Sequence, residues 1–262
     1  MTEAKLAGIL AGSSHLVSFG VVPLKSENGR TTLMPLNDAE EDFLCLNGPF
    51  PRGESYWAEI ERLAPDYTLF IWWRGNQHIA DYMFASDPPF DFVLSDQIDL
   101  PIMKDSIIVP EQMLREKLAP SFDGLEVLLR NIANGPNRGV FVCGTPPPKA
   151  DATMIRAALA KEPYFVERLA ALGRSADTVP LTSPVTLYKL WKLIQNMSGD
   201  VARKHGAEFI PIPAESQTTE GFLRKDFWLD ITHANANLGR LFLQRLREYL
   251  KEACNASVPN FS

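Results

Sequence analysis

Cysteine, positive charge and long apolar runs are scarce in this sequence, and each shortage excludes a class of protein. The 262 residues include only three cysteines, Cys45, Cys143 and Cys254. An odd number at such wide spacing argues against a disulfide framework and against a metal site. Two of the three lie in the apolar runs FLCL and VFVC. We therefore expect reduced thiols that pack in the core.

The charge balance and the short apolar runs argue against binding to nucleic acid or to a membrane. Lys and Arg number 26 against 32 Asp and Glu, which gives a net charge of −6. Such a balance does not attract nucleic acid or anionic lipid. No stretch approaches the ~20 apolar residues of a membrane span, and the first residues, MTEAKLAGILAG, lack the basic start of a signal peptide. The sequence predicts a cytoplasmic protein.

Motifs that would hold a metal or a nucleotide are missing as well. His15 and His78, even with Asp81, do not form a His-x-x-x-His or a clustered Cys/His pattern. Neither Gly-x-Gly-x-x-Gly nor a Gly-Lys-Ser/Thr ending follows Gly12, which argues against a phosphate-binding loop. We expect no metal and no cofactor.

What the sequence does contain is an alternation of apolar runs with helical patterns. Five runs are apolar enough to be strands buried on both faces: LAGILAG, DFLCL, YTLFIWW, GVFVCG and EFIPI. Helical periodicity fills the segments 54–64, 110–119, 124–133, 151–172 and 183–205, and an amphipathic helix with Leu238, Phe242 and Leu246 on one face ends the pattern. This order predicts an α/β fold, a doubly wound sheet of about five parallel strands with helices on both faces.

The length and the apolar content, 45% of residues, favour one domain over residues 1–262. One segment, Ala85 to Pro110, has no firm helical pattern. A connection of that length is usually a lid, a binding loop or an interface element. We expect it to form a lid or a wall beside the site.

Polar clusters follow three of the predicted strands. They read GSSH from Gly12, RGNQH from Arg74, and FWLDITHANANLG from Phe227. In an open parallel sheet, ligands gather at the carboxyl ends of the strands. Asp230 and His233 are three residues apart, so the carboxylate can orient the imidazole. An imidazole held in this way can activate a hydroxyl, and Ser14 would supply one at the same edge of the sheet.

Several of these blocks resemble the SGNH (GDSL-type) serine esterases and acyltransferases. DITHANANLG is similar to the Asp-x-x-His block of that family, with Asn235 and Gly239 behind it, and GSSH stands in the place of Gly-Asp-Ser. Pro65-Asp66 before the third strand and GTPPP after the fourth are also similar. The resemblance extends from Gly12 to Gly239 and implies a three-layer, flavodoxin-like fold of the SGNH hydrolase type.

The resemblance also implies the roles of single residues. Ser14 would be the nucleophile, His233 the base and Asp230 the orienting acid. The oxyanion hole would consist of the Ser14 backbone N–H, a glycine N–H that maps to Gly48, and the Asn76 side chain.

Three departures from the family pattern leave alternatives open. Ser13 stands where the family has an acidic residue, so either serine is a candidate nucleophile. Gly53 competes with Gly48 for the second block. Arg74 precedes Gly75-Asn76 where a glycine is expected, and it either forms a surface ion pair or faces an anionic group of the substrate.

The sequence therefore predicts a serine hydrolase that cleaves a small carboxylic ester, with an O-acyl group on a sugar or metabolite as one option. The reaction would pass through an acyl-enzyme on Ser14. An O-acyltransferase with the same intermediate and a non-catalytic ligand-binding protein of the same fold are the alternatives. Acyl transfer to an added alcohol would indicate the transferase, and binding without turnover would indicate the binding protein. The oligomeric state does not follow from the sequence.

Overall fold

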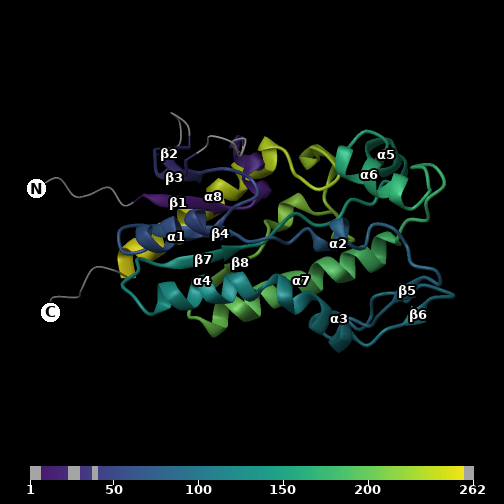
Figure 1. Cartoon of the computed structure of the whole chain (residues 1–262). Helices are drawn as coiled ribbons and strands as arrows, with labels where there is room; N and C mark the ends of the chain where they lie inside the picture. The colour runs from purple at the N-terminus through teal and green to yellow at the C-terminus, as the bar shows by residue number, and fades with distance from the viewer. Residues whose placement is uncertain (1–6, 23–29, 37–40, 257–262) are drawn as a thin grey trace, which may run out of the picture.

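Six of the strands in the described residues form one mixed sheet at the centre of the molecule (Figure 1). This computed structural model describes residues 7–22, 30–36 and 41–256, with side chains described as far as residue 253. The sheet has the order β2-β3-β1-β4-β7-β8. The bounds of its strands are β1 Gly8–Gly12, β2 Thr32–Pro35, β3 Phe43–Asn47, β4 Thr68–Trp72, β7 Val140–Cys143 and β8 Glu208–Ile210.

The five predicted strands are all present, and they pair in parallel. Taken alone, they have the order second-first-third-fourth-fifth of flavodoxin-like sheets, which confirms the predicted fold class. β2 is an additional strand that pairs antiparallel with β3 at the edge. Its residues are mostly exposed, so it lacks the apolar run by which the other strands were predicted.

Helices cover both faces of the sheet, because alternate strand residues point to opposite sides. Ile9, Leu69 and Val142 belong to one apolar cluster, with α1 (Glu54–Leu63), α4 (Asp123–Ala133) and α7 (Pro184–Lys204). Leu10, Phe70 and Phe141 belong to the other, with α8 (Ala236–Ala256) and the 3₁₀ helix η1 (Ser14–Phe19). The three layers are therefore as predicted.

The remaining elements are short. The helices are α2 Gln77–Ala80, α3 Glu111–Leu118, α5 Ala152–Leu159 and α6 Pro163–Ala171, and the 3₁₀ helices are η2 Ala119–Ser121, η3 Ala214–Ser216 and η4 Lys225–Phe227. The predicted helix over 151–172 is two helices, because Pro163 starts a new one at its first turn. No helix among the described residues is long and apolar enough to cross a bilayer.

Two of the three cysteines lie in the core as predicted. Cys45 and Cys143 are buried free thiols. Burial raises the pKa of Cys45 to about 12 and also raises the pKa of Cys143. Both thiols are therefore protonated near neutral pH. The side chain of Cys254 lies outside the described residues.

The long segment 85–110 is anchored to the helix α7. Its strands β5 (Phe90–Asp91) and β6 (Ile107–Ile108) form a small parallel sheet of their own. Both carboxylate oxygens of Asp91 contact the ammonium of Lys189, at 3.0 and 2.9 Å, and neither side chain has any exposed surface. This ion pair therefore attaches the segment firmly to α7. Its role as a lid or wall stays a prediction.

Candidate active site

The end of β1 is held so that the chain turns sharply into η1. Gly12 has a φ of +139°, and a Cβ at this position would lie 2.2 Å from the Trp72 carbonyl oxygen. Only glycine permits this close approach of β1 to β4. The Gly12 N–H donates to the Tyr56 hydroxyl at 2.8 Å, and that hydroxyl donates to the Leu46 carbonyl at 3.0 Å. These bonds fix the point from which the next residues leave the sheet.

Ser13 and Ser14 follow directly, and their hydroxyls differ in environment. The Ser13 N–H donates to the Trp72 carbonyl at 2.9 Å, and the Ser13 Oγ is buried and makes no hydrogen bond to a described residue. Both serines are half-buried as residues, but the Ser14 Oγ, on the first residue of η1, is not enclosed in this way. Because a nucleophile must meet its substrate, this difference favours Ser14 over Ser13.

The start of α8 packs directly on η1, which brings together segments more than 200 residues apart in the sequence. A Cβ on Gly239 would lie 2.0 Å from the Ser18 carbonyl oxygen, so the two backbones are in close contact. His15 and His233 meet edge to face, with ring centroids 5.8 Å apart. The structure thus places the residues of GSSH and DITH side by side at the carboxyl end of the sheet.

Asp230 is committed to the turn that carries His233. Its Oδ2 lies 2.7 Å from His233 Nδ1, and its Oδ1 accepts from the backbone N–H groups of Thr232 at 2.8 Å and of His233 at 2.6 Å. Burial of the carboxyl opposes its ionisation. The bonds and charge of His233 and the two N–H groups outweigh burial and hold the pKa of Asp230 below its usual range. Asp230 is therefore a carboxylate at neutral pH.

This bond determines which nitrogen of His233 can act as a base. With Nδ1–H directed at the carboxylate, the lone pair of the neutral ring lies on Nε2. The Nε2 atom is buried and makes no hydrogen bond to any described residue. The ring is thus oriented, and its basic nitrogen is available.

Ser14 and His233 do not yet form the predicted nucleophile–base pair. Within the described part of the chain, no hydrogen bond joins Ser14 Oγ to His233 Nε2. Catalytic hydrogen bonds are often long without a substrate and shorten in the reacting complex. The prediction of this pair therefore stands as a proposal.

Asn76 lies at the carboxyl end of β4, on a loop whose shape requires glycine. Gly75 has a φ of +115°, and a Cβ there would lie 2.6 Å from Thr145 Oγ1. The Gly75 N–H donates to Gln77 Oε1 at 2.9 Å, and its carbonyl accepts from Thr145 Oγ1 at 3.1 Å. Asn76 caps α2 with its backbone alone, and its half-buried side chain makes no hydrogen bond to a described residue. The amide is therefore free to donate.

The two candidate glycines of the second block have different surroundings. Gly48 is buried, and its N–H donates to Asn47 Oδ1 at 2.8 Å. Gly53 is exposed and precedes α1. The burial of Gly48 beside Tyr56 favours it over Gly53, but its N–H must leave Asn47 or be shared before it can bind an oxyanion. Arg74 is exposed and pairs with no carboxylate among the described residues.

His15 and His78 lie in the same region, buried and unprotonated. Burial, followed by the nearby charges of His233 and His78, lowers the pKa of His15 to about 3. Burial likewise lowers the pKa of His78 to about 3. Within the described residues, no group of three or more His, Cys, Asp or Glu side chains is arranged to hold a metal ion.

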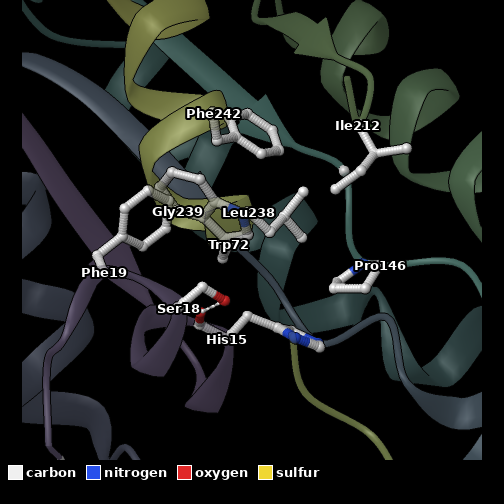
Figure 2. A pocket seen from close by; sticks show the side chains of 10 residues that line it. His15, Ser18, Phe19, Trp72, Pro146, Ile212, Leu238, Gly239 and Phe242 are labelled. Atoms are coloured by element: carbon white, nitrogen blue, oxygen red, sulfur yellow. Dashed lines mark hydrogen bonds between the residues drawn. The ribbon is translucent and has the colours of Figure 1, made fainter. Parts of the chain in front are cut away.

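A small apolar cavity opens beside His15 (Figure 2). It measures about 10 Å³, which is room for about one water-sized group. Its lining comes from η1, β4, α8 and the loops after β7 and β8, and it includes Phe19, Trp72, Leu238 and Phe242. Both ring nitrogens of His15 are buried, and neither makes a hydrogen bond within the part of the chain that the structure describes.

Two charged residues at this site carry no signal in the sequence. Lys149 follows the run GTPPP, and its ammonium donates to the carbonyl oxygens of Asp230 and His233. Glu162 precedes α6 and accepts from the Ile231 N–H at 3.0 Å. Lys149 lies outside the predicted helical segments, and Glu162 lies within the predicted segment 151–172, whose pattern gives it no role at the site.

Comparison with known proteins finds no matching family profile and no similar curated sequence. Several solved structures align over most of the chain. A GDSL-like lipase from Bacteroides thetaiotaomicron is 9% identical, with a TM-score of 0.44, over 95% of this chain and 89% of that one. A carbohydrate acetylesterase from Sinorhizobium meliloti is 14% identical (TM-score 0.42, 93% and 99%). A phospholipase A1 from Streptomyces albidoflavus is 16% identical (0.43, 93% and 99%). The function proposed below rests on this chain's own residues.

Proposed function

We propose that this protein is a serine hydrolase that cleaves a small carboxylic ester, as the resemblance to SGNH enzymes implies. The observation that carries the proposal is the 2.7 Å contact between Asp230 and His233 Nδ1, which leaves a free Nε2 on a turn beside η1. Ser14 begins η1, and this half-buried residue lies at the same edge of the sheet. A carboxylate, an imidazole and a serine in this arrangement are the parts that acyl transfer needs.

In the first half of the proposed reaction, His233 Nε2 takes the proton of Ser14 as Oγ attacks the ester carbonyl carbon. Asp230 stabilises the imidazolium that results. The carbonyl oxygen becomes negative and accepts hydrogen bonds from the Asn76 amide and the Ser14 backbone N–H, with Gly48 as the third candidate donor. The bond to the alkoxy group then breaks, and the imidazolium gives its proton to the departing alcohol. An acyl group remains on Ser14.

The second half repeats these steps with water. His233 removes a proton from the water as its oxygen attacks the acyl carbon, and the proton passes to Ser14 Oγ when the bond to the serine breaks. A carboxylic acid leaves, and the free enzyme returns. A small-molecule ester is the only partner that this chemistry requires. The cytoplasmic location stays a prediction.

Labelling with a fluorophosphonate probe tests the proposal. The probe reacts with activated serines, and peptide mass locates the adduct. We expect an adduct on Ser14 in the wild type and in the Ser13→Ala variant, and none in the Ser14→Ala or His233→Ala variants. An adduct on Ser13, or no adduct on folded wild-type protein, would overturn the assignment.

A further inference from the structure

Lys149 is a buried cation whose hydrogen bonds to described residues both go to the turn that carries His233. Its side chain is 3% exposed. The ammonium nitrogen donates to the His233 carbonyl oxygen at 2.9 Å and also to the Asp230 carbonyl oxygen. These contacts join the loop after β7 to a turn more than 80 residues further along the chain. One side chain thus holds both ends of the turn.

Burying the ammonium of Lys149 costs solvation free energy, so its hydrogen bonds to the turn are needed to keep it charged. An ammonium group that loses its water must find strong acceptors, or it gives up its proton. Here the acceptors are two carbonyl oxygens, and the carboxylate of Asp230 stays bonded to His233 Nδ1. The turn is also held in its middle, where the Ile231 N–H donates to Glu162 at 3.0 Å. The backbone of 230–233 is therefore fixed from two other segments.

We infer that Lys149 is a positioning residue for His233: by holding the Asp230 and His233 carbonyls it sets the turn that aims Nε2 towards Ser14. The inference rests on the proposed function. The bond from Nδ1 to Asp230 restricts rotation of the imidazole about its side-chain bonds. The direction of Nε2 therefore depends on where the backbone of the turn lies. A small displacement of a reacting group can lower the rate by ~10²-fold.

The charge of Lys149 is sensitive to pH in the range where an esterase is assayed. Burial lowers the pKa of Lys149 to about 8, against the opposing charges of Asp230 and Glu162. The other titratable groups near it are His233 on the turn, His15 on η1 and His78 on α2, and the last two are unprotonated near neutral pH. Above pH about 8 the amine loses its charge, and its bonds to the two carbonyls weaken.

Kinetics of three variants test the inference in the full-length protein. Lys149→Met removes the donor, Lys149→Arg keeps a charge at every accessible pH, and Lys161→Met makes the same change at an exposed lysine. We expect Lys149→Met to lower kcat by about 10²-fold with KM nearly unchanged, and Lys161→Met to match the wild type. The wild-type kcat should fall above pH about 8, and Lys149→Arg, if folded, should lack that fall.

A measurement that needs no turnover separates this inference from the proposed function. The proton between His233 Nδ1 and Asp230 gives an NMR signal that broadens when the ring is free to move. We expect a sharp signal in the wild type and in Lys161→Met, and a broadened signal in folded Lys149→Met. An unchanged signal in Lys149→Met, or an unchanged kcat and pH profile, would overturn the role of Lys149. If Ser14→Ala still abolishes turnover in that case, the proposed function stands without it. If the wild type shows no turnover, the signal alone decides on Lys149.

Discussion

Two segments of the molecule, residues 85–110 and the turn 230–233, are each held by one buried lysine. The two lysines differ in the oxygen atoms to which they donate. Lys189 contacts both carboxylate oxygens of Asp91 and the Phe92 carbonyl, and it fixes the segment 85–110 to α7. Lys149 donates to two carbonyl oxygens of the turn 230–233 and to no carboxylate among the described residues. In the first segment both oxygens of the carboxylate are paired with the cation. In the second it is left free to serve the imidazole.

The difference shows that a buried lysine and an aspartate can stabilise the fold at one place and orient a catalytic side chain at another. Asp91 also accepts from the backbone N–H groups of Phe92 and Met103, so its oxygens are fully committed to the fold. Asp230 makes comparable bonds to its own turn, yet one oxygen faces His233 Nδ1. We therefore expect changes at the first pair to affect unfolding, and changes at the second turn to affect the reaction.

The largest expected effect is on the reaction. Replacing His233 by Ala should lower kcat by at least about 10⁴-fold, because the neighbouring imidazole of His15, with a pKa of about 3, is too weak a base to replace it. Circular dichroism and thermal melting should show a fold close to that of the wild type, since the ring is at the edge of the core. A His233→Ala variant that retains turnover would contradict the account of the turn.

The next effect is on stability. Lys189→Met leaves the Asp91 carboxylate buried without its cation, which should lower the free energy of unfolding by about 3–5 kcal/mol. Urea denaturation measures this change, and kcat of the folded fraction should stay within about twofold. The double variant Asp91→Asn/Lys189→Met should recover part of the loss. A large loss of kcat in folded Lys189→Met would show that the segment 85–110 takes part in the reaction.

A smaller effect is expected at the oxyanion site. Asn76→Ala removes one donor to the developing negative charge and should lower kcat by about 10²- to 10³-fold with little change in KM. Asn235→Ala is the matched control, since it makes the same change at an asparagine whose amide already donates to the Asp226 and Trp228 carbonyls. That change should act on stability first. Equal losses of kcat in the two variants would count against the role given to Asn76.

The smallest effect is a difference in the pH dependence of stability. The pKa of Lys149 is about 8 in the folded protein against an ordinary value of 10.5. Between these values the unfolded chain binds more protons, so this group makes the protein more stable as pH rises. Activity should fall over the start of the same range. Urea midpoints of the wild type compared with Lys149→Met would reveal this opposite trend, and a parallel fall of both would refute it.

The sequence predicted the parts of this fold that repeat a pattern. Strands such as β4 are continuous apolar runs because they are buried on both faces, and α8 shows its packed face through Leu238, Phe242 and Leu246. β2 was missed because an exposed edge strand needs no apolar run. The break between α5 and α6 was missed although Pro163 marks it.

The site was predictable only where its residues are close together in the sequence. Asp230 and His233 are close in sequence, so their spacing alone indicates that they meet. Lys149 reaches them across more than 80 residues, and a single lysine after a proline run has no period and no motif. Its place depends on how the loop after β7 packs, which the sequence pattern does not contain.

If the turn 230–233 aims His233 at a nucleophilic Ser14, an ester substrate should leave its acyl group on that serine. The protein would be mixed with p-nitrophenyl acetate, quenched in acid within milliseconds, digested and analysed by peptide mass. The account predicts an acetyl group on Ser14 in the wild type and none in His233→Ala. Product formation with the acetyl group on another residue, or with no acylated peptide in a burst of nitrophenol, would contradict it.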